Sequence, residues 1–177
     1  MEANTVQIDR SGDAPVFTFS DSFNVAVHMI DRHIDEARKD RIAYITEHDT
    51  VTYGQLAERV SRCGNALRAA GIPTGGRMLM IVKDCPEFVY LYYGAIKAGI
   101  IPVPINTLLR ASDYQYMIDD SECSALIYSP DFEGEVGPAL SGASRTPPFV
   151  ALTEGGGGIG DMIAAASDVL EAHPSDP

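Results

Sequence analysis

The sequence contains no tryptophan, and its 177 residues include only three cysteines and 13 basic side chains. The cysteines are widely spaced, with no Cys-x-x-Cys pair and no Cys/His spacing that would suit zinc. They are Cys63, Cys85 and Cys123. An odd number of cysteines in an acidic globular chain favours reduced thiols and a cytoplasmic location. The composition therefore predicts no metal site.

Basic charge is scarce relative to acidic charge. The chain has 25 Asp and Glu residues against 13 Lys and Arg residues, which gives a formal net charge of −12. Nonspecific binding to nucleic acid or to an anionic membrane requires a basic surface. The predicted partners therefore include no nucleic acid and no membrane. The first 20 residues also lack the apolar core of a signal peptide.

One stretch of low charge, Phe88–Ile105, resembles a membrane span in length because Lys97 is its only charged residue. Gly99 is placed to end a helix inside it, since glycine adopts positive φ without steric cost. The stretch therefore predicts a buried helix followed by a buried strand. Pro102 and Pro104 lack the N–H groups that a strand ladder needs, so this strand is expected near a sheet edge or bending away from it.

What the sequence does contain is enough apolar material for a packed core, at 45% of all residues. Residues 1–22 show no sustained hydrophobic period and are expected to form a loose N-terminal extension. In residues 23–177, strands alternate with helices of ten or more residues, which is typical of right-handed crossovers in a parallel sheet. The predicted fold class is α/β, with a doubly wound, mostly parallel sheet and helices on both faces.

Turn, cap and periodicity signals place the individual elements. The expected strands are Ile42–Thr46, Val51–Thr52, Arg77–Val82, a run from Ile100 to Val103, Ala125–Ser129 and Phe149–Leu152. The first two are expected to form a small β-hairpin. The expected helices follow caps at Asn24, Thr52, Asp84 or Cys85, and Ser112, and a last helix covers Ile159–Ala172. Thr52 and Gln55 have the spacing of a capping box. In the helix after Ser112, Tyr116 and Met117 are expected to face inward.

Several short motifs resemble those of a known enzyme family. They are Phe-Asn-Val-Ala at 23–26, Thr-Tyr-Gly-Gln-Leu at 52–56, Asp-Cys-Pro-Glu-Phe at 84–88, the stretch from Gly94 to Leu109, and Asp-Tyr-Gln-Tyr-Met at 113–117. Together they resemble the start of the acyl-adenylate-forming enzymes, the superfamily of AMP-binding acyl-CoA synthetases. The motif Asn-Thr-Leu-Leu at 106–109, together with residues 23–26, narrows the resemblance to benzoate–CoA ligases and their close relatives.

The resemblance implies a ligase that uses ATP and Mg²⁺ to convert a small aromatic carboxylate into an acyl-adenylate, and then transfers the acyl group to coenzyme A. In that family the phosphate-binding loop and the catalytic lysine come later in the chain, so no catalytic residue is predicted here. Residues 23–177 would then be the N-terminal α/β subdomain of the large adenylating domain, truncated before that loop. Alone, this part is expected to be inactive, to bind no cofactor, to pack against the remainder of its own chain, and to self-associate.

Two residues are candidates for contact with coenzyme A. Arg110 follows the strand that begins at Ile100, at an end where ligands of open α/β sheets collect. In related aryl-CoA ligases a basic residue on the corresponding loop contacts a phosphate of coenzyme A, and the resemblance implies this role for Arg110. Asn106 on the same loop is the second candidate. The alternatives are a solvated arginine at a helix start and an asparagine that holds a turn.

A glycine tract, Gly155–Gly158, lies between a predicted strand and a predicted helix, where phosphate could bind. No Lys-Ser or Lys-Thr follows it, so a surface loop is the favoured interpretation. Two other functions remain open from the sequence. One is a non-catalytic α/β module that binds a partner or regulates a ligase, and the other is an independent nucleotide-binding domain.

Overall fold

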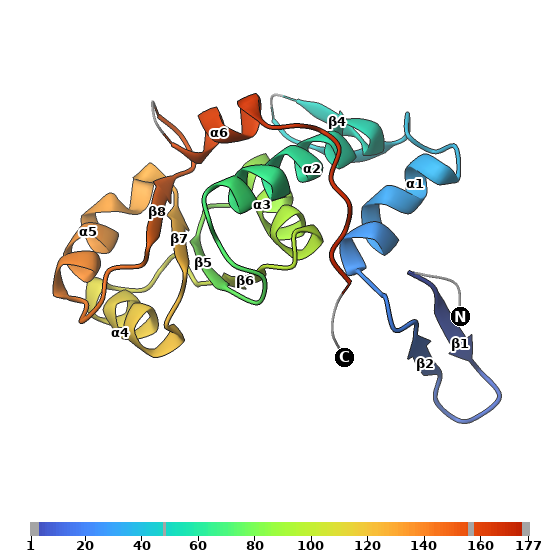
Figure 1. Ribbon diagram of the computed structural model, residues 1–177, viewed down its shortest axis with the longest axis horizontal. Coiled ribbons are helices and arrows are strands. Elements are labelled where there is room, and N and C mark those ends of the chain that lie inside the picture. The colour runs from blue at the N-terminus through green and yellow to red at the C-terminus, as the bar shows by residue number, and fades with distance from the viewer. Residues whose placement is uncertain (1–3, 48, 156–157, 175–177) are drawn as a thin grey trace.

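The computed structural model describes residues 4–47, 49–155 and 158–174 (Figure 1). The expected turn at His48 and the middle of the glycine tract, Gly156 and Gly157, therefore lie outside the described residues. The described part forms a layered α/β unit with two small hairpins beside it (Figure 1).

A four-stranded parallel sheet forms the centre of the fold. Its strands are β5 (Arg77–Ile81), β6 (Ile101–Pro104), β7 (Ala125–Tyr128) and β8 (Phe149–Leu152), in the spatial order β6-β5-β7-β8. All three strand pairs are parallel. The predicted parallel sheet is confirmed, and β6 lies at an edge, where its two prolines cost no ladder hydrogen bonds on the outer side.

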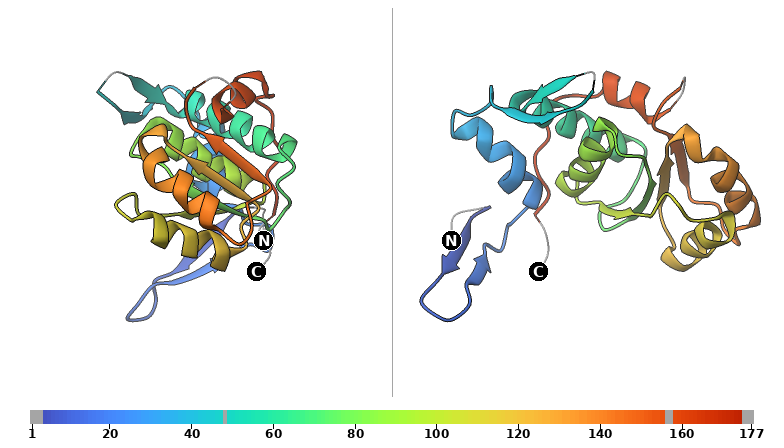
Figure 2. Two further views of the ribbon diagram at one scale, coloured as in Figure 1. Left: turned by 90° about the vertical axis from the view of Figure 1, so that its left-hand side faces the viewer. Right: turned by 180° about the vertical axis from the view of Figure 1, so that it is seen from behind.

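Helices cover both faces of this sheet. One face carries α2 (Tyr53–Ala69), α3 (Pro86–Lys97) and α6 (Ile159–Ala165), and the other carries α4 (Ala111–Ser121) and α5 (Glu133–Gly142) (Figure 2). The predicted doubly wound arrangement is confirmed. Alternate residues of β5 divide between the two cores: Met78 and Met80 pack on the α2 side, whereas Leu79 and Ile81 pack on the α4 side.

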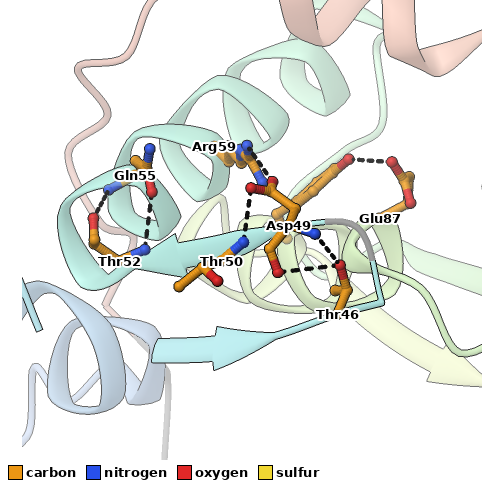
Figure 3. Close-up of polar contacts among 8 residues, drawn as sticks. Thr46, Asp49, Thr50, Thr52, Gln55, Arg59 and Glu87 are labelled. Atoms are coloured by element: carbon orange, nitrogen blue, oxygen red, sulfur yellow. Dashed lines mark hydrogen bonds and ion pairs between the residues drawn. The ribbon is translucent and has the colours of Figure 1, made fainter. Parts of the chain in front are cut away.

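The predicted hairpin before α2 is confirmed as β3 (Ile42–Ile45) paired antiparallel with β4 (Thr50–Thr52). The capping box at the start of α2 is also present (Figure 3). Thr52 Oγ1 accepts a hydrogen bond from the Gln55 amide at 3.3 Å, and Gln55 Oε1 accepts one from the Thr52 amide at 2.9 Å. Two N–H groups that the helix itself cannot pair are thereby satisfied.

The N-terminal segment differs from the loose extension expected for residues 1–22. Strand β1 (Val6–Asp9) pairs antiparallel with β2 (Val16–Phe19), and Asp9 Oδ1 accepts a hydrogen bond from the Ser11 amide in the connecting turn. The strands are four residues each and mostly exposed, so the segment lacks the buried periodicity by which strands are recognised in a sequence. The domain boundary at residue 22 stays a prediction.

The helix expected after Asn24 is present, but its first part is widened. A π-helical segment, η1 (Val27–Asp31), leads into α1 (Arg32–Asp35). Asn24 Oδ1 accepts a hydrogen bond from the Ala26 amide at 3.0 Å, as a cap should. Asn24 Nδ2 also donates to the carbonyl oxygens of Ile96 and His173, so one buried asparagine joins three parts of the chain.

Two expectations about the helices that cover the other face are wrong. The helix after β6 starts at Ala111 rather than beyond Ser112, because Asp113 Oδ2 accepts from the Arg110 amide at 3.0 Å and caps the helix two residues earlier. Tyr116 is 64% exposed instead of facing inward, and Tyr114 takes the buried position. The short helix η2 (Pro130–Phe132) and α5 were not predicted from the sequence.

The last predicted helix is shorter than expected, since α6 ends at Ala165 and not at Ala172. Residues 166–174, called the strap below, instead run extended across α2 and α3 (Figure 1). Arg62 Nη1 donates to the Ala166 carbonyl at 2.6 Å, and Asn65 Nδ2 donates to two further strap carbonyls. These side chains replace the hydrogen bonds that a longer helix would have made within itself.

Candidate binding site at the carboxyl edge of the sheet

The topology brings residues from distant parts of the chain to one edge of the sheet. From β5 the chain moves outward to β6 and then returns across the sheet to β7, so the direction of winding reverses between β5 and β7. In open α/β sheets, ligands bind at the carboxyl ends of the strands near such a switch point. A binding site is therefore expected among the residues that follow the four strands.

Polar side chains after β5, β7 and β8 meet at this edge and are called the edge cluster. They are Lys83, Ser129, Asp131, Thr153 and Glu154. Lys83 Nζ lies 2.9 Å from Asp131 Oδ2 and 3.2 Å from Glu154 Oε1. Hydrogen bonds to Asp131 and then to Glu154 raise the pKa of Lys83, so its ammonium stays protonated and cannot act as a base near neutral pH.

Backbone and hydroxyl contacts complete the edge cluster. Ser129 Oγ accepts a hydrogen bond from the Lys83 amide at 3.1 Å, and Thr153 Oγ1 lies 3.5 Å from Ser129 Oγ. Both Ser129 and Thr153 are buried, whereas the Lys83 side chain is 38% exposed. The cluster thus ties three strand ends together and leaves a paired positive charge near the surface, an arrangement suited to structure and binding rather than to bond making.

The loop between β6 and α4 lies at the same edge and contains both residues predicted to contact coenzyme A. Asn106 Oδ1 accepts a hydrogen bond from the Leu108 amide at 2.9 Å, and the Tyr114 hydroxyl donates to the Asn106 carbonyl at 3.2 Å. This geometry gives Asn106 the turn-holding role that was the alternative interpretation. Its contact with a ligand stays a prediction.

Arg110 lies at the end of the same loop and is highly accessible. Its side chain is 79% exposed, and its guanidinium contacts Glu135 among the described residues, at 3.1 Å between Nη1 and Oε1. A guanidinium carries five N–H donors, so most of its donors remain open to solvent. The position therefore suits the binding of an anion, and the assignment of Arg110 to coenzyme A stays a prediction.

A hollow of about 460 Å³ lies between α2, α3, α6 and the β3–β4 hairpin. Figure 3 shows three of its charged residues, Asp49, Arg59 and Glu87, approaching from three different elements. Arg59 Nη2 lies 3.5 Å from Asp49 Oδ2, and the Tyr90 hydroxyl donates to Glu87 Oε1 at 2.7 Å. Burial opposes ionisation of Glu87, but the Tyr90 hydrogen bond helps to hold its pKa below the ordinary value. The charges are balanced within the hollow, so it favours no particular class of ligand.

The sequence predicted that Asn106 and Arg110 lie at this edge, but it did not predict the edge cluster. Lys83 and Asp131 are 48 positions apart, and no motif connects them. The available signal was positional, since Ser129 ends one predicted strand and Thr153 directly follows another. Of the glycine tract, Gly155 has a φ of +96° and Gly158 precedes α6, but the residues between them are not described.

With this geometry in place, comparison with known proteins identifies the family. The sequence profile of the AMP-binding enzymes matches residues 30–155. The chain belongs to the AMP-binding enzyme family. Within this family it is 35% identical to a benzoate–CoA ligase of Thauera aromatica, over 96% of this chain and 32% of that enzyme. It is 32% identical to a 3-hydroxybenzoate–CoA ligase of an Aromatoleum species, over 88% of this chain and 30% of that enzyme.

Solved structures of AMP-binding enzymes share the fold. A benzoate–CoA ligase from Burkholderia xenovorans LB400 has a TM-score of 0.76 at 30% identity, covering 88% of this chain and 30% of that one. The anthranilate–CoA ligase AuaEII, in complex with anthranoyl-AMP, has a TM-score of 0.81 at 26% identity, covering 89% of this chain and 30% of that one. The chain thus spans about a third of the length of such relatives.

The described residues contain neither a candidate membrane span nor a cluster of side chains suited to a metal ion. No helix in the described part is long and apolar enough to cross a membrane. The stretch from Phe88 to Ile105 contains most of α3 and all of β6, so the predicted helix and strand are confirmed, but β6 is partly exposed rather than buried, with Ile101 48% exposed. Among the same residues, no group of three or more His, Cys, Asp or Glu side chains is arranged to hold a metal ion.

Proposed function

We propose that this chain is the N-terminal α/β part of an ATP-dependent ligase that joins an aromatic carboxylate of the benzoate type to coenzyme A. The observation that carries the proposal is the 35% identity to a benzoate–CoA ligase across 96% of the chain. Family membership and the parallel sheet that it shares with two aryl-CoA ligase structures support it.

The reaction of such a ligase has two steps. The carboxylate attacks ATP to form an acyl-adenylate and pyrophosphate, with Mg²⁺ accompanying the nucleotide, and the thiol of coenzyme A then displaces AMP to form the thioester. We assign the enzyme to the cytoplasm, where ATP and coenzyme A are available. The aromatic carboxylate, ATP and coenzyme A are its proposed partners, together with the remainder of the ligase chain.

Within this reaction the chain contributes to the coenzyme A side. Arg110 supplies an exposed guanidinium at the carboxyl edge of the sheet, and that donor set fits a phosphate group of coenzyme A. Asn106 fixes the turn that carries Arg110 to the edge. No described residue is assigned to catalysis, since the only lysine of the edge cluster is held protonated by two carboxylates.

A hybrid enzyme tests the proposal. This chain replaces the matching segment of the Thauera aromatica benzoate–CoA ligase, and the product is assayed for benzoyl-CoA. We expect benzoate-dependent formation of benzoyl-CoA, because the sheet and its carboxyl edge are retained. A hybrid that melts cooperatively, as the parent enzyme does, but forms neither benzoyl-AMP nor benzoyl-CoA would contradict the proposal.

A further inference from the structure

Glu135, on the first turn of α5, holds the loop that carries Arg110. Its two carboxylate oxygens divide between two donors on neighbouring residues. Oε1 accepts from Arg110 Nη1 at 3.1 Å, and Oε2 accepts from the Ala111 amide at 2.7 Å. Glu135 therefore connects α5, which follows β7, to the start of α4, which follows β6.

The contact with the Ala111 amide fixes the position of the carboxylate. Ala111 is the first residue of α4, and its N–H is one of the donors that the helix cannot pair internally. A carboxylate at this place forms a charge-assisted hydrogen bond and also meets the positive end of the helix. Because Oε2 is fixed on the backbone, Oε1 can hold the Arg110 guanidinium in only a narrow range of positions.

The backbone of Arg110 is held independently. Its amide donates to Asp113 Oδ2 at 3.0 Å, and its carbonyl accepts from the Asp113 amide at 2.9 Å. Of the guanidinium donors, only Nη1 contacts Glu135, and the side chain remains 79% exposed. The arrangement directs the guanidinium without covering the face that would meet a ligand.

We propose that Glu135 is a positioning residue for Arg110, which restricts the guanidinium to the orientation that binds a phosphate of coenzyme A. This inference rests on the proposed function, because it assigns Glu135 a part in coenzyme A binding. An arginine that is already oriented loses less conformational freedom when it binds, so its affinity for the phosphate is higher. Glu135 touches no substrate, and its effect on coenzyme A binding comes through Arg110.

A double-mutant cycle in the hybrid ligase described above tests the proposal. The variants are Arg110→Ala, Glu135→Ala and the double substitution, and Glu133→Ala is the matched control, since it removes a carboxylate from the same helix that instead accepts from the Tyr128 hydroxyl. We expect Arg110→Ala to raise the KM for coenzyme A about tenfold or more and Glu135→Ala to raise it several-fold. The rate of benzoate-dependent ATP–pyrophosphate exchange should stay unchanged in each variant.

The cycle separates positioning from simple stabilisation. If Glu135 acts through Arg110, the double variant has the same KM for coenzyme A as Arg110→Ala alone. Fully additive effects, or an effect of Glu135→Ala no larger than that of Glu133→Ala, would overturn the positioning role and leave the ligase function intact. A normal KM in Arg110→Ala would overturn the coenzyme A contact and the role of Glu135 together, while benzoyl-CoA formation by the hybrid would still support the ligase.

Discussion

At the scale of single residues, small side chains set how closely the covering helices approach one another. Gly64 on α2 and Gly94 on α3 lie at the point where these helices cross. A Cβ atom at Gly64 would lie 2.8 Å from the Gly94 carbonyl oxygen and 2.3 Å from Leu170 of the strap. The absence of a side chain at Gly64 therefore allows two close contacts of α2, one with α3 and one with Leu170 of the strap.

Gly64→Ala should destabilise the protein by about 1–3 kcal/mol, because the added methyl group overpacks a site with no free space. Gly134→Ala on α5 is the matched control, since a Cβ there would meet nothing within 4 Å. That control should be neutral or stabilising by up to about 1 kcal/mol. Urea denaturation followed by circular dichroism measures both, and equal stabilities of the two variants would refute the packing argument.

At the scale of elements, the strap shows how a segment without regular structure is held in place. Two side chains of α2 donate three hydrogen bonds to its backbone: Arg62 contacts Ala166, and Asn65 contacts Ser167 and Val169. Leu170 provides the apolar anchor at 9% exposure. The three hydrogen bonds from α2 all end on carbonyl oxygens, so they depend on the extended backbone of the strap more than on its side chains.

Asn65→Ala should loosen the strap, because it removes two hydrogen bonds to strap carbonyls of 2.8 and 2.9 Å. Limited proteolysis should then cut within residues 166–174 several times faster than in the parent chain, while the sheet stays protected. Gln115→Ala is the control, since it removes one hydrogen bond of 2.7 Å, to the Gly142 carbonyl on the opposite face. Unchanged cleavage of the strap in Asn65→Ala would show that its remaining contacts, such as those of Arg62 and Leu170, hold it without Asn65.

The elements that could be predicted from the sequence were those with local signals. The Thr52 capping box and the glycine stop at Gly99, which has a φ of +80°, mark helix ends by chemistry that acts over a few residues. Helix α5 escaped prediction because Gly134, Gly137 and Pro138 all disfavour a helix, and its formation depends on tertiary burial of apolar side chains.

The residues of the candidate site also divide into those with a local sequence signal and those without one. The loop that carries Asn106 and Arg110 was predicted from the strand before it and from a family motif. Glu135 was not, because it lies 24 positions from Ala111 and only the packing of α5 beside α4 brings the two together. A residue such as Glu135, which positions another side chain, leaves no local pattern in the sequence. Arg110, the exposed residue that it positions, follows a strand end and could be predicted.

At the scale of the whole molecule, the N-terminal hairpin carries apolar side chains that stay about half exposed, although the Phe19 ring contacts that of Phe23 at 4.8 Å between centroids. The register places Val6 opposite Phe19 and Ile8 opposite Phe17, so these four residues share one face. Phe17 is 54% and Phe19 is 52% exposed. Figures 1 and 2 show the hairpin projecting away from the four-stranded sheet. A two-stranded hairpin is marginally stable without a packed face.

The isolated chain should therefore bind a dye that reports exposed apolar surface, or should self-associate. Replacing Phe17 and Phe19 with serine should reduce both signals, since each exposed phenyl ring is removed from the apolar face of the hairpin. Dye fluorescence and light scattering provide the measurement. A monodisperse monomer with no dye signal and a sharp melting transition at high temperature would contradict the prediction that the isolated chain exposes a sticky apolar surface.

The central claim, that this chain is one part of a benzoate-type CoA ligase, is tested most directly by pyrophosphate release from the purified 177-residue chain. The assay contains ATP, Mg²⁺, benzoate and coenzyme A, with and without the downstream remainder of the Thauera aromatica ligase. The account predicts no turnover above background for the chain alone and benzoate-dependent pyrophosphate release when the two parts are combined. Turnover by the chain alone, or no release from a complex of the two folded parts, would contradict it.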